Sequence, residues 1–249
     1  MEHLDFIKNR RSIRKYKNQI VPDELIKDLL EEAFRASTMG NMQLYSVVQT
    51  RDDEMKRKIA PFHFNQPMIT DASVVLTFCA DFNRFSKWCR ERQAEPGYDN
   101  FLSFINAFSD ALLVVQNFCT LAEANGLGIC YIGTTIYNPD PIIDLLRLPK
   151  LVMPVATITV GYPDEHPEQT DRLPVDSLIH KETYHDYSSE DLDVCYAYKE
   201  SLPESQTYMS ENHKQTLAQV FTDVRYKKSD NECMSDGLLE TLRKQGFLK

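Results

Sequence analysis

A cluster of cations near the N-terminus is the part of the sequence best suited to bind an anion. The chain carries a formal net charge of -9 at pH 7, yet no acidic residue lies between Lys8 and Lys17. The basic side chains of this segment are Lys8, Arg10, Arg11, Arg14, Lys15 and Lys17. Guanidinium groups make paired, charge-assisted hydrogen bonds to phosphates, and Ser12 adds a hydroxyl among them. The segment predicts a site for a phosphate or another dianion, and the alternative is a solvated basic loop without a ligand.

A polar loop at residues 37–44, STMGNMQL, is a second candidate for ligand contact. The amides of Asn41 and Gln43 each offer a donor and an acceptor, which suits a flavin or the edge of a base. Glycine, serine and asparagine are equally the usual residues of an ordinary turn. From these residues alone, an ordinary connection between a helix and a strand is favoured.

The stretch Gly126–Gly133, GLGICYIG, resembles a dinucleotide-binding loop only loosely. A G-x-G-x-x-G fingerprint would need glycine where Tyr131 stands, and no helix clearly begins there. We therefore reject a Rossmann fold, although glycines still allow a ligand to approach the backbone closely.

Apolar patterning predicts a helical layer packed on a sheet of about four strands, an α+β fold. The strand candidates include Tyr45–Thr50, Ala72–Ala80 and Val152–Val160. An amphipathic helix should begin near Asp23, and Phe101–Asn125 should form one long helix that is apolar on most sides. Towards the C-terminus, three more helices are expected at Glu190–Glu200, Ser210–Phe221 and Ser235–Gly246.

Composition narrows the setting of the protein. A chain of 249 residues with 42% hydrophobic and 26% charged residues is typical of a soluble globular protein. Its pI near 5.2 argues against nucleic-acid binding. Six scattered cysteines without a CxxC pair favour a reducing compartment over disulfides or a metal site. We find no signal peptide and expect no membrane-spanning segment, so the expected location is the cytoplasm.

The order of several motifs resembles the FMN-dependent nitroreductase family. These motifs are RRSIRKY, GNMQ, GLGICYIG after the long helix, and VGYP…RLP…IHKETY near residue 180. The similarity spans essentially the whole chain and is greatest to the oxygen-insensitive nitroreductases and NADPH–flavin oxidoreductases. The resemblance implies a single three-layer α+β domain over residues 1–249, with a central, mostly antiparallel sheet. It also implies an intertwined homodimer in which residues 190–249 wrap the partner subunit.

The resemblance also gives the candidate site residues a role. Arg10, Arg11, Ser12 and Arg14 would hold the FMN ribityl chain and phosphate, and Arg172 would add a further cation. The remaining expected contacts to the cofactor are Ser37, Thr38, Asn41, Gln43, Gln66, Ile132, Gly133 and Thr134. No catalytic side chain and no metal are implied, because the chemistry takes place at flavin N5.

The implied reaction is a ping-pong reduction. NAD(P)H would reduce the flavin and leave, and a nitroaromatic, quinone or flavin acceptor would then take two electrons in the same cleft. A specialised flavin, quinone or enone reductase and a flavin-storage protein with little turnover are the alternatives. Two departures from the family stand out. Residues 200–206, ESLPESQ, contain no cation for an NADPH 2′-phosphate, and Thr170 and Asp171 replace a lysine before Arg172.

Overall fold

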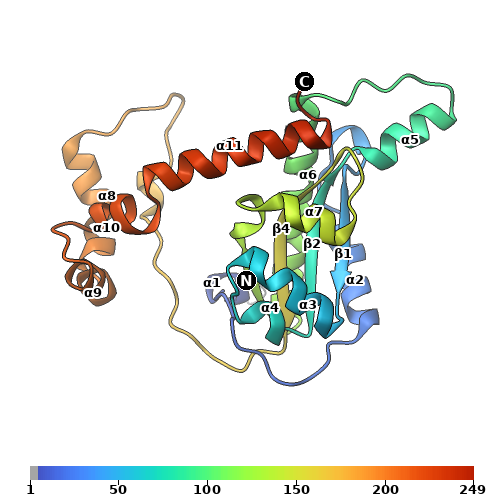
Figure 1. Ribbon diagram of the computed structural model, residues 1–249. Coiled ribbons are helices and arrows are strands. Elements are labelled where there is room, and N and C mark those ends of the chain that lie inside the picture. Colours follow the sequence, from blue (N-terminus) through green and yellow to red (C-terminus); the bar gives the residue numbers. More distant parts are fainter. Residues whose placement is uncertain (1–4) are drawn as a thin grey trace. The chain divides into compact units, whose positions relative to one another are not determined.

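The computed structural model describes residues 5–249 and divides into two compact units (Figure 1). The first unit runs to Glu168 and resumes at Met234–Lys249, and the second comprises Gln169–Cys233. The single domain over residues 1–249, with an extension from residue 190 that wraps a partner, stays a prediction.

A four-stranded antiparallel sheet forms the centre of the first unit. Its strands are β1 (Tyr45–Thr50), β2 (Val74–Asp81), β3 (Gly128–Ile132) and β4 (Val152–Gly161), in the order β1-β2-β4-β3. Each neighbouring pair is antiparallel. Every residue of β2 and β4 is buried, which explains why their sequences are apolar without the alternation of a half-exposed strand. The predicted α+β class with an antiparallel sheet is confirmed.

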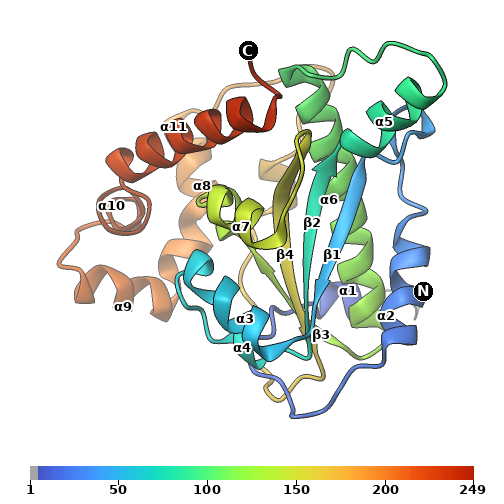
Figure 2. The same cartoon turned by 45° about the vertical axis from the view of Figure 1, so that its right-hand side comes forward.

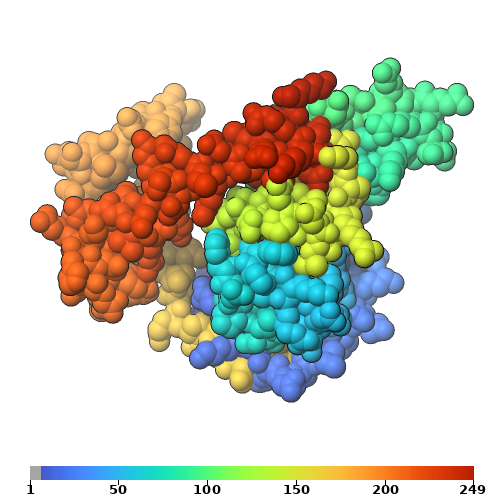
Figure 3. Space-filling model, in the orientation of Figure 1, coloured from blue at the N-terminus to red at the C-terminus, as the bar shows by residue number. Residues whose placement is uncertain are grey.

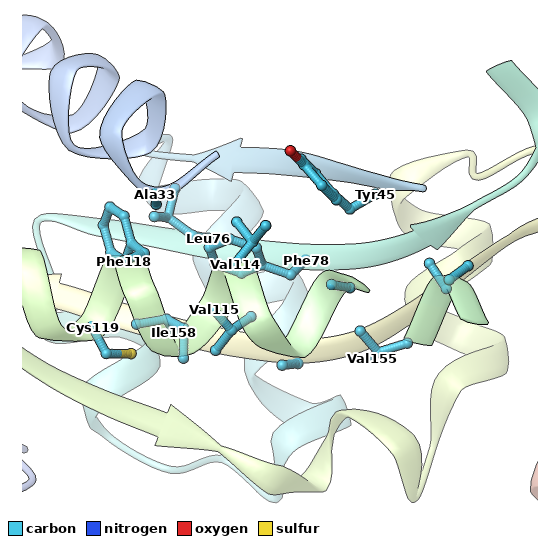
Figure 4. Close-up of a cluster of buried hydrophobic side chains, with 14 of the residues drawn as sticks. Ala33, Tyr45, Leu76, Phe78, Val114, Val115, Phe118, Cys119, Val155 and Ile158 are labelled. Carbon is cyan, nitrogen blue, oxygen red and sulfur yellow. The ribbon is translucent and has the colours of Figure 1, made fainter. Parts of the chain in front are cut away.

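The larger hydrophobic core lies between the sheet and helices α2 (Asp23–Ala33) and α6 (Phe101–Ala124). Figure 4 shows how α6 side chains interdigitate with those of the two central strands. Its labelled residues are Ala33, Tyr45, Leu76, Phe78, Val114, Val115, Phe118, Cys119, Val155 and Ile158. Asn100 caps α6 by accepting a hydrogen bond from the Ser103 amide at 3.0 Å, which fixes where the helix begins.

A second layer of short helices covers the opposite face of the sheet (Figure 2), and the surface of this layer faces the viewer in Figure 3. It consists of α3 (Asp53–Ile59), η3 (Ala60–His63), α4 (Met68–Asp71), η4 (Gly133–Ile136) and α7 (Pro139–Leu146). These elements enclose a smaller core that includes Ile59, Ile69, Ile132 and Ile142. The three-layer fold is confirmed, and the single helical layer expected from element order is wrong. The short elements carry too few turns to show a helical stripe.

The first unit contains three further helical segments. They are α1 (Asp5–Lys8), α5 (Asn83–Glu91) and the part of α11 (Lys228–Gln245) from Met234 onward. Phe247 follows α11 and is buried in the larger core. Lys244 forms an ion pair with Asp140 of α7 at 2.6 Å. The segment after Met234 therefore packs on the first unit of its own chain.

The second unit is built from the short helices α8 (Ser189–Ser201), α9 (Pro203–Glu211) and α10 (Leu217–Val220), after the turn η5 (Val175–Ser177). A π-helical turn, Phe221–Arg225, follows α10. The predicted continuous helix Ser210–Phe221 is wrong. His213 has a left-handed backbone with φ of 53°, and Thr216 begins a new helix by a capping box with Gln219.

By length and composition alone, helix α6 is long and apolar enough to cross a membrane, contrary to the expectation from the sequence. Its residues Ala111, Val114, Phe118 and Ala122 are nevertheless buried against the sheet. This packing accounts for its apolar composition as that of a core helix.

The basic segment lies directly on the edge of the sheet, and two glycines make this close approach possible. The Ile13 amide donates to the Ile129 carbonyl at 2.9 Å, and Tyr16 forms a β-bridge with Pro163. Gly128 and Gly161 face each other across β3 and β4. A Cβ at Gly128 would lie 2.8 Å from Ile13, and one at Gly161 would lie 2.7 Å from Tyr16. Side chains at these positions would push the segment off the sheet.

Replacing Gly161 by alanine tests this docking. Gly161→Ala should destabilise the fold by about 1–3 kcal/mol, the usual cost of overpacking a close contact. The added methyl group cannot be avoided easily, because the Tyr16 hydroxyl is held by Thr159 Oγ1 at 2.7 Å. Gly97→Ala is the matched control, since a Cβ there meets nothing within 4 Å. Urea unfolding measures both, and equal stability of the two variants would contradict the docking.

Candidate functional site

A cavity of about 300 Å³ lies where the basic segment meets the start of β3. Arg10 and Arg11 line it together with Gly128, Glu165 and His166. The Arg11 Nη1 donates to the Asn9 carbonyl at 2.7 Å, while its Nε is buried without a hydrogen-bond partner among the described residues. A buried guanidinium nitrogen of this kind is costly unless a ligand satisfies it. The cavity therefore has the cations and the unmet donor expected of an anion site.

Glu123, near the end of α6, forms an ion pair with Arg10. Its Oε2 lies 3.4 Å from Arg10 Nε, and the side chains of Arg10 and Glu123 are 26% and 12% exposed. Burial raises the pKa of Glu123 to about 7, although the charge of Arg10 opposes this shift. The second carboxylate oxygen, Oε1, is buried without a hydrogen-bond partner among the described residues.

Glu165 holds the backbone of the basic segment. One carboxylate oxygen, Oε1, accepts hydrogen bonds from the amides of Arg14 and Lys15 at 2.6 and 3.1 Å. The Arg14 side chain is exposed, and burial raises the pKa of the Cys130 thiol on β3, while the nearby charge of Arg14 opposes that rise. Arg10 and Arg11 therefore lie near the start of β3, and Arg14 lies farther along it.

The opposite end of β3 leads into a network around the buried His63. Its Nδ1 is 3.0 Å from Thr134 Oγ1, and its carbonyl accepts a hydrogen bond from Gln66 Nε2 at 3.1 Å. Burial lowers the pKa of His63 to about 4, so the imidazole is uncharged near neutral pH. The structure thus brings Gln66 near the Gly133–Thr134 turn, and Ile132 contributes backbone because its side chain is buried.

The distance between these two ends follows from strand geometry. Gly128 begins β3 and Gly133 follows its last residue. At a rise of about 3.3 Å per residue, the two positions lie roughly 16 Å apart. A ligand with an anionic group at one end and a planar ring at the other could therefore extend along the edge formed by β3.

The polar loop is organised by Asp110, a buried residue on α6. Thr38 Oγ1 donates to Asp110 Oδ2 at 2.5 Å and accepts from the Gln43 amide at 2.9 Å. The amides of Met39 and Leu44 also donate to this carboxylate. Within the loop, η2 (Met39–Asn41) contains Gly40 with φ of 53°, and Asn41 and Gln43 also have positive φ. The loop therefore has a defined conformation that is held by hydrogen bonds to Asp110 and Thr38.

The loop borders a different cavity from the basic segment. Thr38, Asn41 and Gln43 line a cavity of about 660 Å³ that shares no lining residue with the one beside Arg10 and Arg11. Asp110 anchors the loop and Glu123 contacts Arg10, and these two residues are thirteen positions apart on α6. At about 1.5 Å per residue, the anchors are roughly 20 Å apart along the helix axis. One chain thus presents the candidate residues as separate groups.

Ser37 and Arg172 line neither of these two cavities. Ser37 is exposed just after α2. Arg172 belongs to the second unit, where its Nη1 donates to the Asp171 carbonyl at 2.7 Å and to Thr170 Oγ1 at 2.9 Å. The Asp171 carboxylate forms an ion pair with Lys199 of α8 at 2.9 Å. Its charge is therefore compensated within the second unit.

Sequence reasoning missed the two carboxylates that organise the site. Asp110 and Glu123 are the acidic residues within α6, whose remaining sequence is mostly apolar. Buried charges are rare unless they are paired or hydrogen-bonded, so an acid in such a helix is itself a signal of a structural partner. That signal would have identified both residues, but not the cation or loop that each one contacts.

Comparison with known proteins identifies the family of this chain. The model of the family described as "Nitroreductase family" matches residues 7–162. An FMN reductase (NADPH) of Bacillus subtilis (strain 168) is 33% identical over 183 residues, covering 73% of this chain and 74% of the relative. A second FMN reductase of that strain, named for NAD(P)H, is 30% identical and covers 99% of this chain and 98% of its own.

A solved structure extends the similarity over nearly the whole chain. The crystal structure of a protein from Bacteroides fragilis NCTC 9343 is 63% identical, with a TM-score of 0.97. The match covers 98% of this chain and 100% of that one. The resemblance seen in the motifs is thereby confirmed, and this chain belongs to the nitroreductase family.

Proposed function

We propose that the chain is an FMN-dependent oxidoreductase that uses NAD(P)H to reduce nitroaromatic, quinone or flavin acceptors in the cytoplasm. The observation that carries the proposal is the cavity beside Arg10 and Arg11, in which the buried Arg11 Nε has no partner among the described residues. A phosphate oxygen is a suitable acceptor for that donor. Family membership and relatives named as FMN reductases support the choice of FMN.

Each group of residues then has a defined task. Arg10, Arg11, Ser12 and Arg14 hold the phosphate and ribityl chain at the start of β3. Gln66 and the backbone of residues 132–134 contact the flavin ring at the far end of β3. There, His63 is hydrogen-bonded to both Gln66 and Thr134. Arg172 is a further candidate cation for the phosphate, as the motif resemblance implies. When bound, FMN supplies the redox chemistry, by accepting electrons from NAD(P)H and passing two of them to the acceptor.

A second copy of the chain would complete each site. Ser37, Thr38, Asn41 and Gln43 belong to the loop whose anchor is about 20 Å along α6 from the anchor of the phosphate-binding cations. Helix α6 also exposes apolar side chains, with Leu102 69% and Leu113 49% exposed. Exposed apolar surface on a helix that is otherwise a core element favours a subunit interface. We therefore propose a homodimer in which the loop of one copy contacts the flavin held by the other.

Anaerobic spectroscopy of the purified protein tests the function. We expect a yellow protein that NADH or NADPH bleaches and that a nitroaromatic compound restores to yellow. Recovery by quinone or free flavin alone would identify a specialised reductase. Yellow protein that neither nucleotide bleaches would contradict an NAD(P)H-dependent enzyme and leave flavin storage.

Removing Arg11 tests the phosphate contact. Arg11→Ala should weaken FMN binding by roughly 1.5–3 kcal/mol, because it deletes a charge-assisted hydrogen bond. Fluorescence titration of flavin-free protein gives the affinity. Lys17→Ala is the matched control, since Lys17 belongs to the same basic segment but does not line the cavity beside Arg11. Equal affinities of the two variants would remove Arg11 from the site.

Mixed dimers test whether two copies share each site. Thr38→Val removes the hydroxyl that joins Asp110 to the Gln43 amide, so it should loosen the loop. A dimer of one Arg11→Ala chain and one Thr38→Val chain should bind one FMN with native affinity. Both substitutions then fall in the same site, and the other site is intact.

The control places both substitutions in one chain and pairs it with a native chain. In a shared site, each half of that dimer is impaired and no native affinity remains. Native affinity in the control dimer, together with its loss in the first dimer, would show that each site is built from a single chain.

A further inference from the structure

Glu123 is a carboxylate at a place where the proposed function requires an anion to bind. It is 12% exposed and contacts Arg10, which lines the same cavity as Arg11. A phosphate bound by these arginines would place two like charges near a shared guanidinium group, in a partly buried setting where their repulsion is not fully screened. Either the phosphate binds weakly, or the carboxylate loses its charge.

The surroundings of Glu123 make loss of its charge feasible. Its Oε1 has no hydrogen-bond partner among the described residues, so the ion pair with Arg10 is the contact that favours the charged form. Burial already raises the pKa of Glu123 to about 7. A small further change of field therefore suffices to protonate it near neutral pH.

We propose that Glu123 is a counter-ion of Arg10 when no phosphate is bound, and that it takes up one proton from solvent when the FMN phosphate binds. The phosphate then replaces the carboxylate as the anion paired with Arg10. Glu123 is thus a positioning residue that acts through Arg10 and couples FMN affinity to pH. The proposal rests on the proposed function, because it requires FMN at this cavity.

The other charged groups around the cavity do not provide the same coupling. Arg11 adds a second cation beside the cavity. Glu165 is already satisfied by the amides of Arg14 and Lys15. His166 also lines the cavity, so it needs a control. Cys119, one turn earlier on α6, has its pKa raised by burial to about 12 and remains a neutral thiol.

The sign of the pH dependence follows from linkage. The phosphate raises the pKa of Glu123 above its value of about 7 in the flavin-free protein, so the complex holds more protons. Affinity is then highest below pH 7 and falls as pH rises, by up to about tenfold per pH unit for one linked proton. Because the second phosphate pKa is about 6, FMN is mainly a dianion above pH 7 and adds little to this slope.

Titration calorimetry of the flavin-free protein, with FMN as the ligand, tests the proposal. Wild-type affinity should fall by up to about tenfold between pH 7 and pH 8. Experiments at pH 7.5 in two buffers of different ionisation enthalpy should show proton uptake on binding. Glu123→Gln should bind FMN with little pH dependence and no proton uptake, whereas His166→Gln should keep both. Riboflavin, which lacks the phosphate, should bind the wild type without proton uptake.

Several results would overturn the proposal. Absence of proton uptake by the wild type needs no variant and removes the coupling. An equal pH slope in wild type and Glu123→Gln assigns the proton to another group. If FMN binds but either of these results is obtained, only the role of Glu123 is overturned and the proposed function stands. If FMN does not bind at any pH, the proposed function is overturned as well.

Discussion

The close contact between the basic segment and the edge of the sheet is the constraint on which the rest of the site depends. Ile13 and Tyr16 can lie on β3 and β4 only because Gly128 and Gly161 present no Cβ. This contact turns Arg10 and Arg11 towards one cavity and fixes their distance from the turn that follows β3. Without it, the arginines would belong to a solvated loop with no defined ligand.

Helix α6 determines the distance between the polar loop and the cations of the basic segment. It carries Asp110, which organises the polar loop, and Glu123, which pairs with Arg10. Because both acids are on one rigid helix, the loop and the cations are held about 20 Å apart along it. The same helix packs one face on the sheet and exposes Leu102 and Leu113. The separation of the two groups and the exposed apolar side chains of α6 support the proposed homodimer.

The parts of the fold that could be predicted from the sequence have strong local signals. The strand Tyr45–Thr50 and the helix from Phe101 were predicted closely, because apolar patterning specifies them within a few residues. The prediction of a helix at Ser210–Phe221 is wrong because the left-handed backbone of His213 interrupts it. The amino-acid composition carries no signal for that conformation. The helical layer around η3 and η4 was missed because its elements are too short to show periodicity.

The features of the candidate site likewise differ in whether the sequence can predict them. The arginines of the basic segment were recognisable from residue type and spacing alone. Their distance from Thr38 and Asn41 was not, because it depends on where α6 places Asp110 and Glu123. Pairings such as Arg10 with Glu123, or His63 with Thr134, join residues far apart in the sequence. Such contacts are decided by the tertiary fold.

A crystal structure of the FMN-loaded protein tests the central claim most directly. We expect a phosphate within hydrogen-bond distance of Arg10 and Arg11, a flavin ring beside Gly133, and the Thr38–Gln43 loop of a second copy against the same flavin. A flavin bound elsewhere, or one enclosed by a single chain with Thr38 and Arg11 of that chain both in contact, would contradict it.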